Sequence, residues 1–128
     1  MQAETRRYIV RRCDAPPPLE AVAGRLPPEW AAADAGEIAG YHPRGGPHRP
    51  AVVFRLLRDD EALHLRFDVQ DRYVRSVHTR PQSPVCTDSC VEFFVQPCPS
   101  SGYFNLEVNA GGTPLLCYIE DPRRRPGD

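Results

Sequence analysis

A strict two-residue alternation of apolar and polar side chains constrains this fold more than any other feature. Between residues 103 and 109, Phe104, Leu106 and Val108 alternate with four polar positions, and residues 63–70 follow the same pattern. Successive side chains of a β-strand point to opposite faces of its sheet, so this period predicts half-buried strands. We therefore expect sheets with one apolar face and one polar face.

Further short runs extend this pattern over the chain. We expect additional strands at residues 1–12 (an edge strand centred on Tyr8, Ile9 and Val10), 51–57, 91–96 and 113–120. The polar turn at residues 58–61 joins two of the runs into a hairpin. No long helical period and no βαβ pattern occurs, so the chain predicts an all-β, antiparallel β-sandwich of the jelly-roll or immunoglobulin-like kind.

The segments between the strands are rich in proline, glycine and alanine. Residues 13–50 carry no sustained period, and Pro28 suits the first turn of a short helix. Residues 71–89 form a long loop that contains Pro81 and Pro84. His64 is expected on the exposed face of its strand.

Composition excludes several function classes. The chain has 128 residues, enough for one domain, and a formal net charge of -1, which offers no electrostatic basis for binding nucleic acid. Neither a membrane span nor a signal-peptide core is present in the sequence, so we expect no membrane partner and a cytoplasmic location. Lysine is absent, and 15 prolines are present, which is typical of a GC-rich bacterial genome.

The chain has five cysteines, and this odd number argues against a closed disulfide framework. Cys86 and Cys90 have a C-x3-C spacing without a nearby histidine, whereas structural zinc sites usually show C-x2-C or C-x4-C pairs. We therefore expect free thiols and no metal or other cofactor.

Four blocks of sequence resemble the carbohydrate-binding module family 9-like domains over roughly residues 25–120. The blocks are Trp30 with the small acidic segment after it, Leu57-Arg-Asp-Asp-Glu-Ala-Leu63-His-Leu-Arg-Phe-Asp-Val-Gln-Asp71, Asp88-Ser-Cys-Val-Glu92-Phe-Phe, and Tyr103-Phe-Asn-Leu-Glu107-Val-Asn-Ala-Gly111. On this basis we divide the chain into an N-terminal extension or edge strand (1–24), the sandwich (25–120) and a polar tail (121–128).

The resemblance implies a non-catalytic domain that binds mono- or oligosaccharides of the plant-polysaccharide type. Such domains are often attached to glycoside hydrolases of xylan or cellulose, which would place the chain in polysaccharide catabolism. Well-known members grip sugar between two tryptophans, whereas Trp30 is the only one here and its place suggests a structural role. Members also usually continue for several more strands, so we expect a C-terminally truncated sandwich that self-associates through an uncovered sheet edge.

Sugar recognition needs an aromatic surface for the C–H side of the ring and planar polar groups for its hydroxyls. If the apolar positions face the core, a hydroxyl-matching set lies on the opposite face, where neighbouring strands about 4.8 Å apart would bring it together. Glu92 joins the set, although its orientation is open because Phe93 and Phe94 are both apolar. The predicted ligand-binding residues are Arg66, Asp68, Glu92, Tyr103, Asn105, Glu107 and Asn109.

Other interpretations of the same residues remain open. The polar face is also what the solvated side of an ordinary antiparallel sheet looks like, so a structural or interaction sandwich without sugar binding is the main alternative. Glu92 and Glu107 could be the acid and nucleophile of a glycoside hydrolase fragment. Asp88, Ser89 and Glu92, with Asp68 or Asp71, could hold calcium, or Asp88 could simply accept N–H bonds from the loop before its strand.

Overall fold

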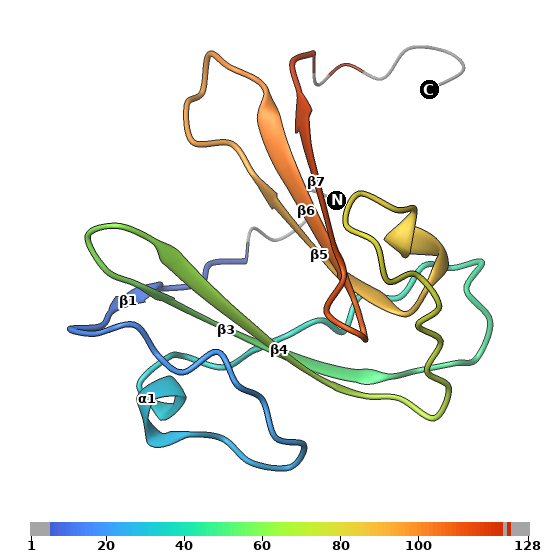
Figure 1. Cartoon of the computed structure of the whole chain (residues 1–128), viewed down its shortest axis with the longest axis horizontal. Helices are drawn as coiled ribbons and strands as arrows, with labels where there is room; N and C mark the ends of the chain where they lie inside the picture. The colour runs from blue at the N-terminus through green and yellow to red at the C-terminus, as the bar shows by residue number, and fades with distance from the viewer. Residues whose placement is uncertain (1–5, 122, 124–128) are drawn as a thin grey trace. The chain divides into compact units, whose positions relative to one another are not determined.

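Strands dominate residues 6–121 and 123, which are the residues that the computed structural model describes. The chain divides into two units, Met1–Arg72 and Tyr73–Asp128, and each contains its own β-sheet (Figure 1). Of the predicted polar tail, only Asp121 and Arg123 lie within the described residues. The expectation of an all-β fold is confirmed, since a single short α-helix and one 3-10 turn accompany the strands of the described chain.

The sheet of the first unit is built on the predicted hairpin. Strand β3 (Ala51–Arg58) pairs antiparallel with β4 (Leu63–Gln70), and Phe54 lies opposite Phe67 in the register. Residues that are paired in this way share a face, so the alternation places the Phe54–Phe67 and Leu56–Leu65 pairs together on one side. The sequence pattern predicted this arrangement correctly.

Two short strands pair with the other edge of β3. Strand β1 (Arg11–Arg12) runs parallel to the end of β3, and β2 (Gly36–Glu37) pairs antiparallel nearer its middle. The prediction of an edge strand centred on Tyr8, Ile9 and Val10 is therefore wrong in position, because the pairing begins only at Arg11. Tyr8 instead packs its ring 5.1 Å from that of Phe54, and its hydroxyl donates to the Asp34 carbonyl (2.5 Å) and accepts from the Leu56 N–H (2.9 Å).

The opposite face of this hairpin is covered rather than solvated. The short helix α1 (Pro28–Ala31) begins with proline at its first position, as predicted, and carries Trp30, which is only 2% exposed. Trp30 forms the core cluster of the unit with Ala33 and the fully buried Leu57, and its indole N–H donates to the Pro18 carbonyl (2.9 Å). The expected structural role of Trp30 is thus confirmed.

This covering segment also corrects the placement of His64. His64 lies opposite Leu57 in the register, and its side chain is 11% exposed because it shares the covered face. The prediction of an exposed strand position for His64 was wrong: a polar residue on an alternating strand is exposed only where no other part of the chain covers that face.

The sheet of the second unit has the order β5-β6-β7, with both pairs antiparallel. Its strands are β5 (Cys90–Val95), β6 (Tyr103–Asn109) and β7 (Pro114–Ile119). In the register, Phe93, Leu106 and Leu116 form one row across the sheet, and Glu92, Glu107 and Leu115 form the next. Apolar and polar pairs of β5 and β6 therefore alternate between the two faces, as the sequence period predicts, while β7 adds a leucine to both rows.

The loop before β5 packs against this sheet. It contains the 3-10 turn η1 (Val85–Thr87), which contacts β5 and β6 and buries Val85 completely. Gln82 adopts a left-handed backbone conformation (φ 66°), and its side-chain amide both donates to the Leu116 carbonyl (3.0 Å) and accepts from the Leu116 N–H (2.8 Å). Gln82 thereby covers part of the outer edge of β7, where an unpaired strand would otherwise expose its backbone.

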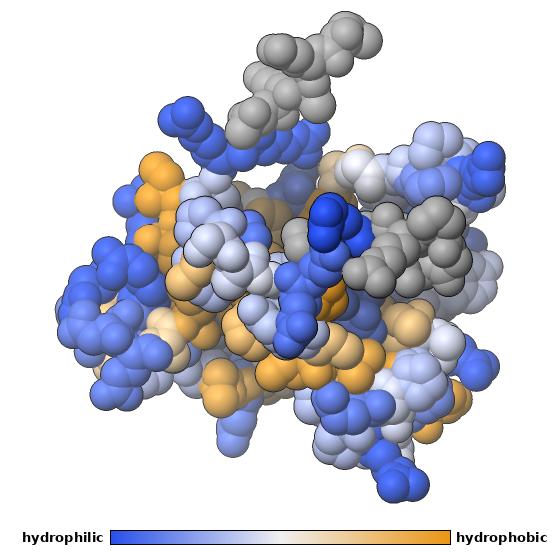
Figure 2. All heavy atoms as spheres, turned by 90° about the horizontal axis from the view of Figure 1, so that it is seen from above, coloured by the Kyte–Doolittle hydropathy of each residue, from blue (hydrophilic) through white to orange (hydrophobic). Residues whose placement is uncertain are grey.

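Many apolar side chains reach the surface of the chain, as Figure 2 shows by their orange colour. The most exposed of the large ones are Leu19, Tyr73, Val74 and Ile9. The described residues include no helix with the length and apolar character needed to cross a bilayer.

Candidate functional site

Five predicted or neighbouring residues come together on one face of the second sheet, which we call the acid–aromatic face: Glu92, Phe94, Tyr103, Asn105 and Glu107. The register places Glu92 directly opposite Glu107 and Phe94 directly opposite Asn105 on the neighbouring strand. This pairing settles the orientation of Glu92, which the apolar pair after it left open in the sequence. Phe94 was not among the predicted site residues, although its position two residues after Glu92 is the signal that places it on the same face.

Two aromatic rings lie at one end of the acid–aromatic face. The ring centroids of Phe94 and Tyr103 are 6.0 Å apart, with the ring planes inclined by 43°. Phe94 is 56% exposed, so a large part of its surface is open, and Tyr103 is half-buried. An exposed aromatic surface beside polar groups is the arrangement that a sugar ring requires.

Polar groups with unused hydrogen-bonding capacity lie next to these rings. The Asn105 side-chain amide donates to Glu107 Oε1 (2.9 Å). Asn105 Oδ1 and Glu107 Oε2 are buried and have no hydrogen-bond partner among the described residues. Buried acceptors nearly always have a donor, so a rotation of these side chains that opens the two atoms to the surface would let a ligand hydroxyl or water supply one.

The charge of Glu107 affects two neighbouring groups. Burial, followed by the charge of Glu107 and a hydrogen bond to it, raises the pKa of Glu92 above its usual value. Burial, followed by the charges of Glu92 and Glu107, raises the pKa of the nearby Cys90 thiol to about 11. The face therefore concentrates negative charge, and Cys90 stays a neutral thiol at ordinary pH.

Asn109 also lies on β6, but every hydrogen-bonding group of its side chain already has a partner within the chain. It is 4% exposed; its amide donates to the His78 carbonyl (2.8 Å) and to Asp88 Oδ2 (3.0 Å). Its Oδ1 accepts from the N–H groups of Gly111 (3.2 Å) and Thr113 (2.8 Å). An asparagine side chain has two donor hydrogens and two acceptor lone pairs, so these contacts use all of them, and we leave Asn109 out of the proposed sugar set.

Asp88 anchors the loop that precedes β5. Its Oδ2 accepts from the N–H groups of Val77 (3.1 Å) and His78 (3.0 Å), as expected for an aspartate at the start of a strand. Burial opposes ionisation, but the bonds from His78, Asn109 and Val77 outweigh it and hold the pKa of Asp88 below its usual value. The Arg75 guanidinium lies 3.5 Å from Oδ1, so the carboxylate already has a cation beside it. Asp68 and Asp71, the other proposed calcium ligands, belong to the first unit.

Arg66 and Asp68 lie on β4, in the sheet of the first unit, while β6 pairs only with β5 and β7 among the described strands. The expectation that β4 and β6 are adjacent strands of one sheet is therefore wrong. The two side chains pair with each other at 2.8 Å, and this pairing raises the pKa of Arg66 and lowers that of Asp68. Arg66 also donates to the Arg25 carbonyl (2.9 Å).

A small cavity adjoins Arg66. Its volume is about 170 Å³, which is below the roughly 300–1,000 Å³ of ordinary ligand pockets. It is lined by Pro18, Leu19, Ala21, Trp30, Leu65, Arg66 and Phe67. The cavity beside the Trp30 cluster is therefore smaller than an ordinary ligand pocket.

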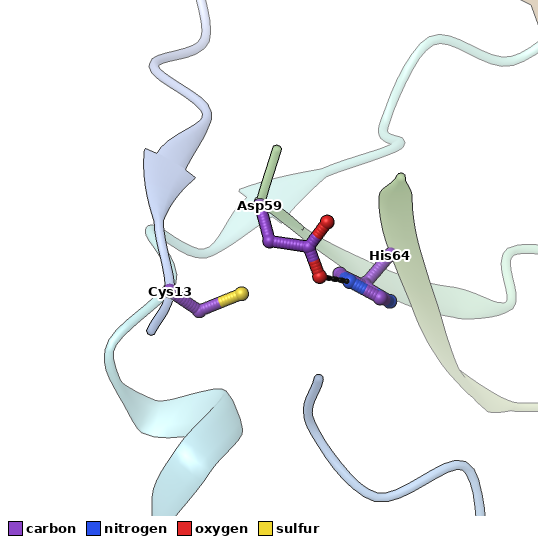
Figure 3. Close-up of side chains that lie close together, drawn as sticks. All are labelled: Cys13, Asp59 and His64. Carbon is purple, nitrogen blue, oxygen red and sulfur yellow. Dashed lines mark hydrogen bonds and ion pairs between the residues drawn. The ribbon is translucent and has the colours of Figure 1, made fainter. Parts of the chain in front are cut away.

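A second cluster of chemically active side chains was not predicted from the sequence. Cys13, Asp59 and His64 lie together in the first unit, with their donor atoms all within 4.8 Å of one another (Figure 3). His64 Nε2 is 2.8 Å from Asp59 Oδ2. Asp59 and His64 are five residues apart across a hairpin turn, which could have indicated their proximity, but nothing in the sequence placed Cys13 beside them.

An all-β chain with carboxylate, amide and aromatic groups side by side on one sheet face has the chemistry of a binding domain for hydroxyl-rich ligands. The family model described as Carbohydrate-binding family 9 matches residues 37–126. The chain belongs to this family, so it is a carbohydrate-binding domain of the β-sandwich class, and families of this kind are non-catalytic binding modules. Comparison with curated proteins and with solved structures found no match.

Proposed function

We propose that the chain binds a mono- or oligosaccharide of the plant-polysaccharide type on the acid–aromatic face, without cleaving it. The observation that carries this proposal is the pair of buried acceptors, Asn105 Oδ1 and Glu107 Oε2, that lack a donor beside the Phe94 and Tyr103 rings. Sugar hydroxyls are donors, and the C–H face of a pyranose packs on an aromatic ring. One ligand would satisfy both requirements.

The spacing of the groups suits a ring of hexose size. Glu92 and Phe94 are on one strand, and Asn105 and Glu107 are on the neighbouring strand about 4.8 Å away. In this arrangement the acceptors bind neighbouring hydroxyls while Phe94 covers one side of the ring. Asn105 is itself held by Glu107, so the amide is oriented before the ligand arrives, which lowers the entropy cost of binding.

The relation of Glu92 to Glu107 supports binding over hydrolysis. Side chains directly opposite each other on antiparallel strands have Cβ atoms about 4.5–5.5 Å apart, and Glu107 lies close enough for its charge to help raise the pKa of Glu92. A glycosidase needs the scissile bond between its two carboxyl groups, which are at least about 5 Å apart. Two carboxyl groups on directly opposed residues of neighbouring strands leave little room for that bond.

Calorimetric titration of the purified chain with glucose, xylose and cellobiose tests the proposal. We expect measurable heat with at least one sugar, and a loss of affinity of at least tenfold in Asn105→Ala and Glu107→Gln. Glu120→Gln, a change at an exposed position just after β7, serves as the matched control and should bind normally. Arg66→Met tests the first unit, and we expect a smaller effect because Arg66 is already paired with Asp68.

The second candidate is a sandwich that serves interaction or structure without sugar binding. It is favoured by the burial of Trp30, which removes the only tryptophan from any stacking surface. Absence of heat with all three sugars would establish this candidate. Release of reducing sugar by the wild type, abolished in Glu107→Gln, would instead support a hydrolase fragment.

A further inference from the structure

The cluster of Cys13, Asp59 and His64 brings three different metal-ligating groups to one point of the first unit. Figure 3 shows the Cys13 sulfur directed toward the Asp59 carboxylate, with the His64 ring on the other side of that carboxylate. The ligand atoms are a thiol sulfur, a carboxylate oxygen and an imidazole nitrogen, all within 4.8 Å of one another. All three residues are partly buried, and none of them is needed for the acid–aromatic face.

The surrounding backbone already holds these groups in place. Asp59 Oδ1 accepts from the N–H groups of Glu61 and Ala62, both at 2.8 Å, which leaves Oδ2 directed at His64. The Cys13 backbone N–H donates to the Arg58 carbonyl (2.8 Å), which ties the segment after β1 to the end of β3. Hydrogen bonds to the metal-ligating residues orient them in metal sites and contribute strongly to the affinity of the site for its metal.

The donor set selects the class of metal. Thiolate sulfur excludes calcium and magnesium, which take oxygen ligands, whereas a sulfur, nitrogen and oxygen set suits zinc and its chemical relatives. Around tetrahedral zinc, with bonds of about 2.0–2.3 Å, neighbouring ligand atoms lie roughly 3.5 Å apart. Atoms within 4.8 Å of one another reach that spacing when the Cys13 side chain moves by roughly 1 Å, which a change in its side-chain torsion provides.

We propose that Cys13, Asp59 and His64 bind a zinc-type divalent transition metal, with water in the fourth position. The metal takes the place of the His64 Nε2 proton, which moves to Nδ1 if the ring is neutral and passes to solvent if the ring is doubly protonated. It also replaces the thiol proton that Cys13 directs at the Arg58 carbonyl (3.3 Å), which passes to solvent. The bound metal links the segment after β1 to the β3–β4 hairpin. It therefore stabilises the first unit through a cross-link between residues 46 positions or more apart in the sequence.

Cobalt(II) and zinc titration of the full chain tests this proposal. Cobalt should produce a thiolate-to-metal charge-transfer band at one equivalent, and zinc should displace it. At a free zinc concentration about 100-fold above the Kd, we expect the melting temperature to rise by roughly 10 °C. Cys13→Ser should abolish the band and weaken zinc binding by more than about 100-fold, since even outer-shell changes cost 10–100-fold.

Controls separate this site from the other thiols. Cys98→Ser, at an exposed position of the second unit, should keep the band and the zinc-induced rise in melting temperature. His64→Gln should lower zinc affinity while leaving the number of free thiols unchanged. A cobalt band that persists in Cys13→Ser, or a wild type without a one-equivalent band, would overturn the proposal and leave a hydrogen-bonded Asp59–His64 turn with a neighbouring thiol.

Discussion

Replacing Asn109 by alanine should destabilise the second unit, because this side chain joins three parts of it. Its amide holds the His78 carbonyl and Asp88 in the loop before β5, and its carbonyl holds the N–H groups of Gly111 and Thr113 in the β6–β7 turn. All four contacts are made by a residue that is 4% exposed. The substitution removes them together without adding bulk.

The size of the destabilisation depends on which hydrogen bonds each partner of Asn109 retains after the substitution. The His78 carbonyl retains the Thr113 hydroxyl (2.8 Å), and the Gly111 N–H retains the Ser76 hydroxyl (2.9 Å). Asp88 Oδ2 retains the Val77 and His78 N–H groups, so among these four partners the Thr113 N–H alone has no second bond. One orphaned amide costs about 1–3 kcal/mol, and three partly compensated bonds cost a few tenths each, for a total of about 3 kcal/mol.

Thermal and urea unfolding of Asn109→Ala measure this effect. About 3 kcal/mol corresponds to a fall in melting temperature of roughly 10 °C for a chain of this size. Gln96→Ala is the matched control, since Gln96 is an exposed amide side chain of the second unit that makes one side-chain bond, to the Ser101 carbonyl. We expect it to cost less than about 1 kcal/mol. A melting temperature of Asn109→Ala within 2 °C of the wild type would refute the reasoning.

Three further predictions concern individual side chains. Asp59→Asn should destabilise the chain at neutral pH: the bond from His64, followed by those from the Glu61 and Ala62 N–H groups, lowers the pKa of Asp59 to about 2. A carboxyl group whose pKa is lowered by folding stabilises the folded chain at any pH above its pKa in the unfolded chain, about 3.9. This stabilisation is lost as the pH falls toward 2, so the melting temperatures of the variant and the wild type should converge near pH 2. Glu92→Gln should raise stability at pH 7 by at most about 1 kcal/mol, because it removes a like-charge pair across β5 and β6. Since the pKa of Glu92 is raised, the gain should vanish below pH 4, and a pH-independent difference in melting temperature would contradict this explanation. Trp30→Ala should cost about 3–5 kcal/mol in urea unfolding, because it empties the centre of the Trp30–Ala33–Leu57 cluster; an effect below 1 kcal/mol would show that Trp30 does not support the first unit.

Local alternation was enough to predict the five longer strands, β3 to β7, and the two faces of β4 and β6. The period of Phe104, Leu106 and Val108 identified β6, and the polar turn between two apolar runs identified the β3–β4 hairpin. Side-chain direction in a strand depends only on position along the chain, so one sequence contains this information. The same rule placed Tyr103, Asn105 and Glu107 on one face.

Only the tertiary structure decided which of these residues share a neighbourhood. Arg66 and Asp68 follow the same alternation as Asn105 and Glu107, but they belong to a different sheet. Strand partners are chosen by contacts between distant segments, and the two-residue period is the same for every strand. The pattern therefore cannot distinguish a neighbouring strand from a remote one.

The two asparagines of β6 also show what depends on the local sequence and what depends on contacts between distant segments. By sequence, Asn105 and Asn109 are equivalent positions on the polar face, four residues apart. The fold brings a loop and a turn onto Asn109 and uses all its hydrogen-bonding groups, while Asn105 keeps an acceptor without a donor. The sequence by itself determined which side of the sheet each side chain occupies. What packs against that side depends on contacts between segments tens of residues apart. Those contacts made Asn109 structural and left Asn105 with the free acceptor on which the proposed sugar site depends.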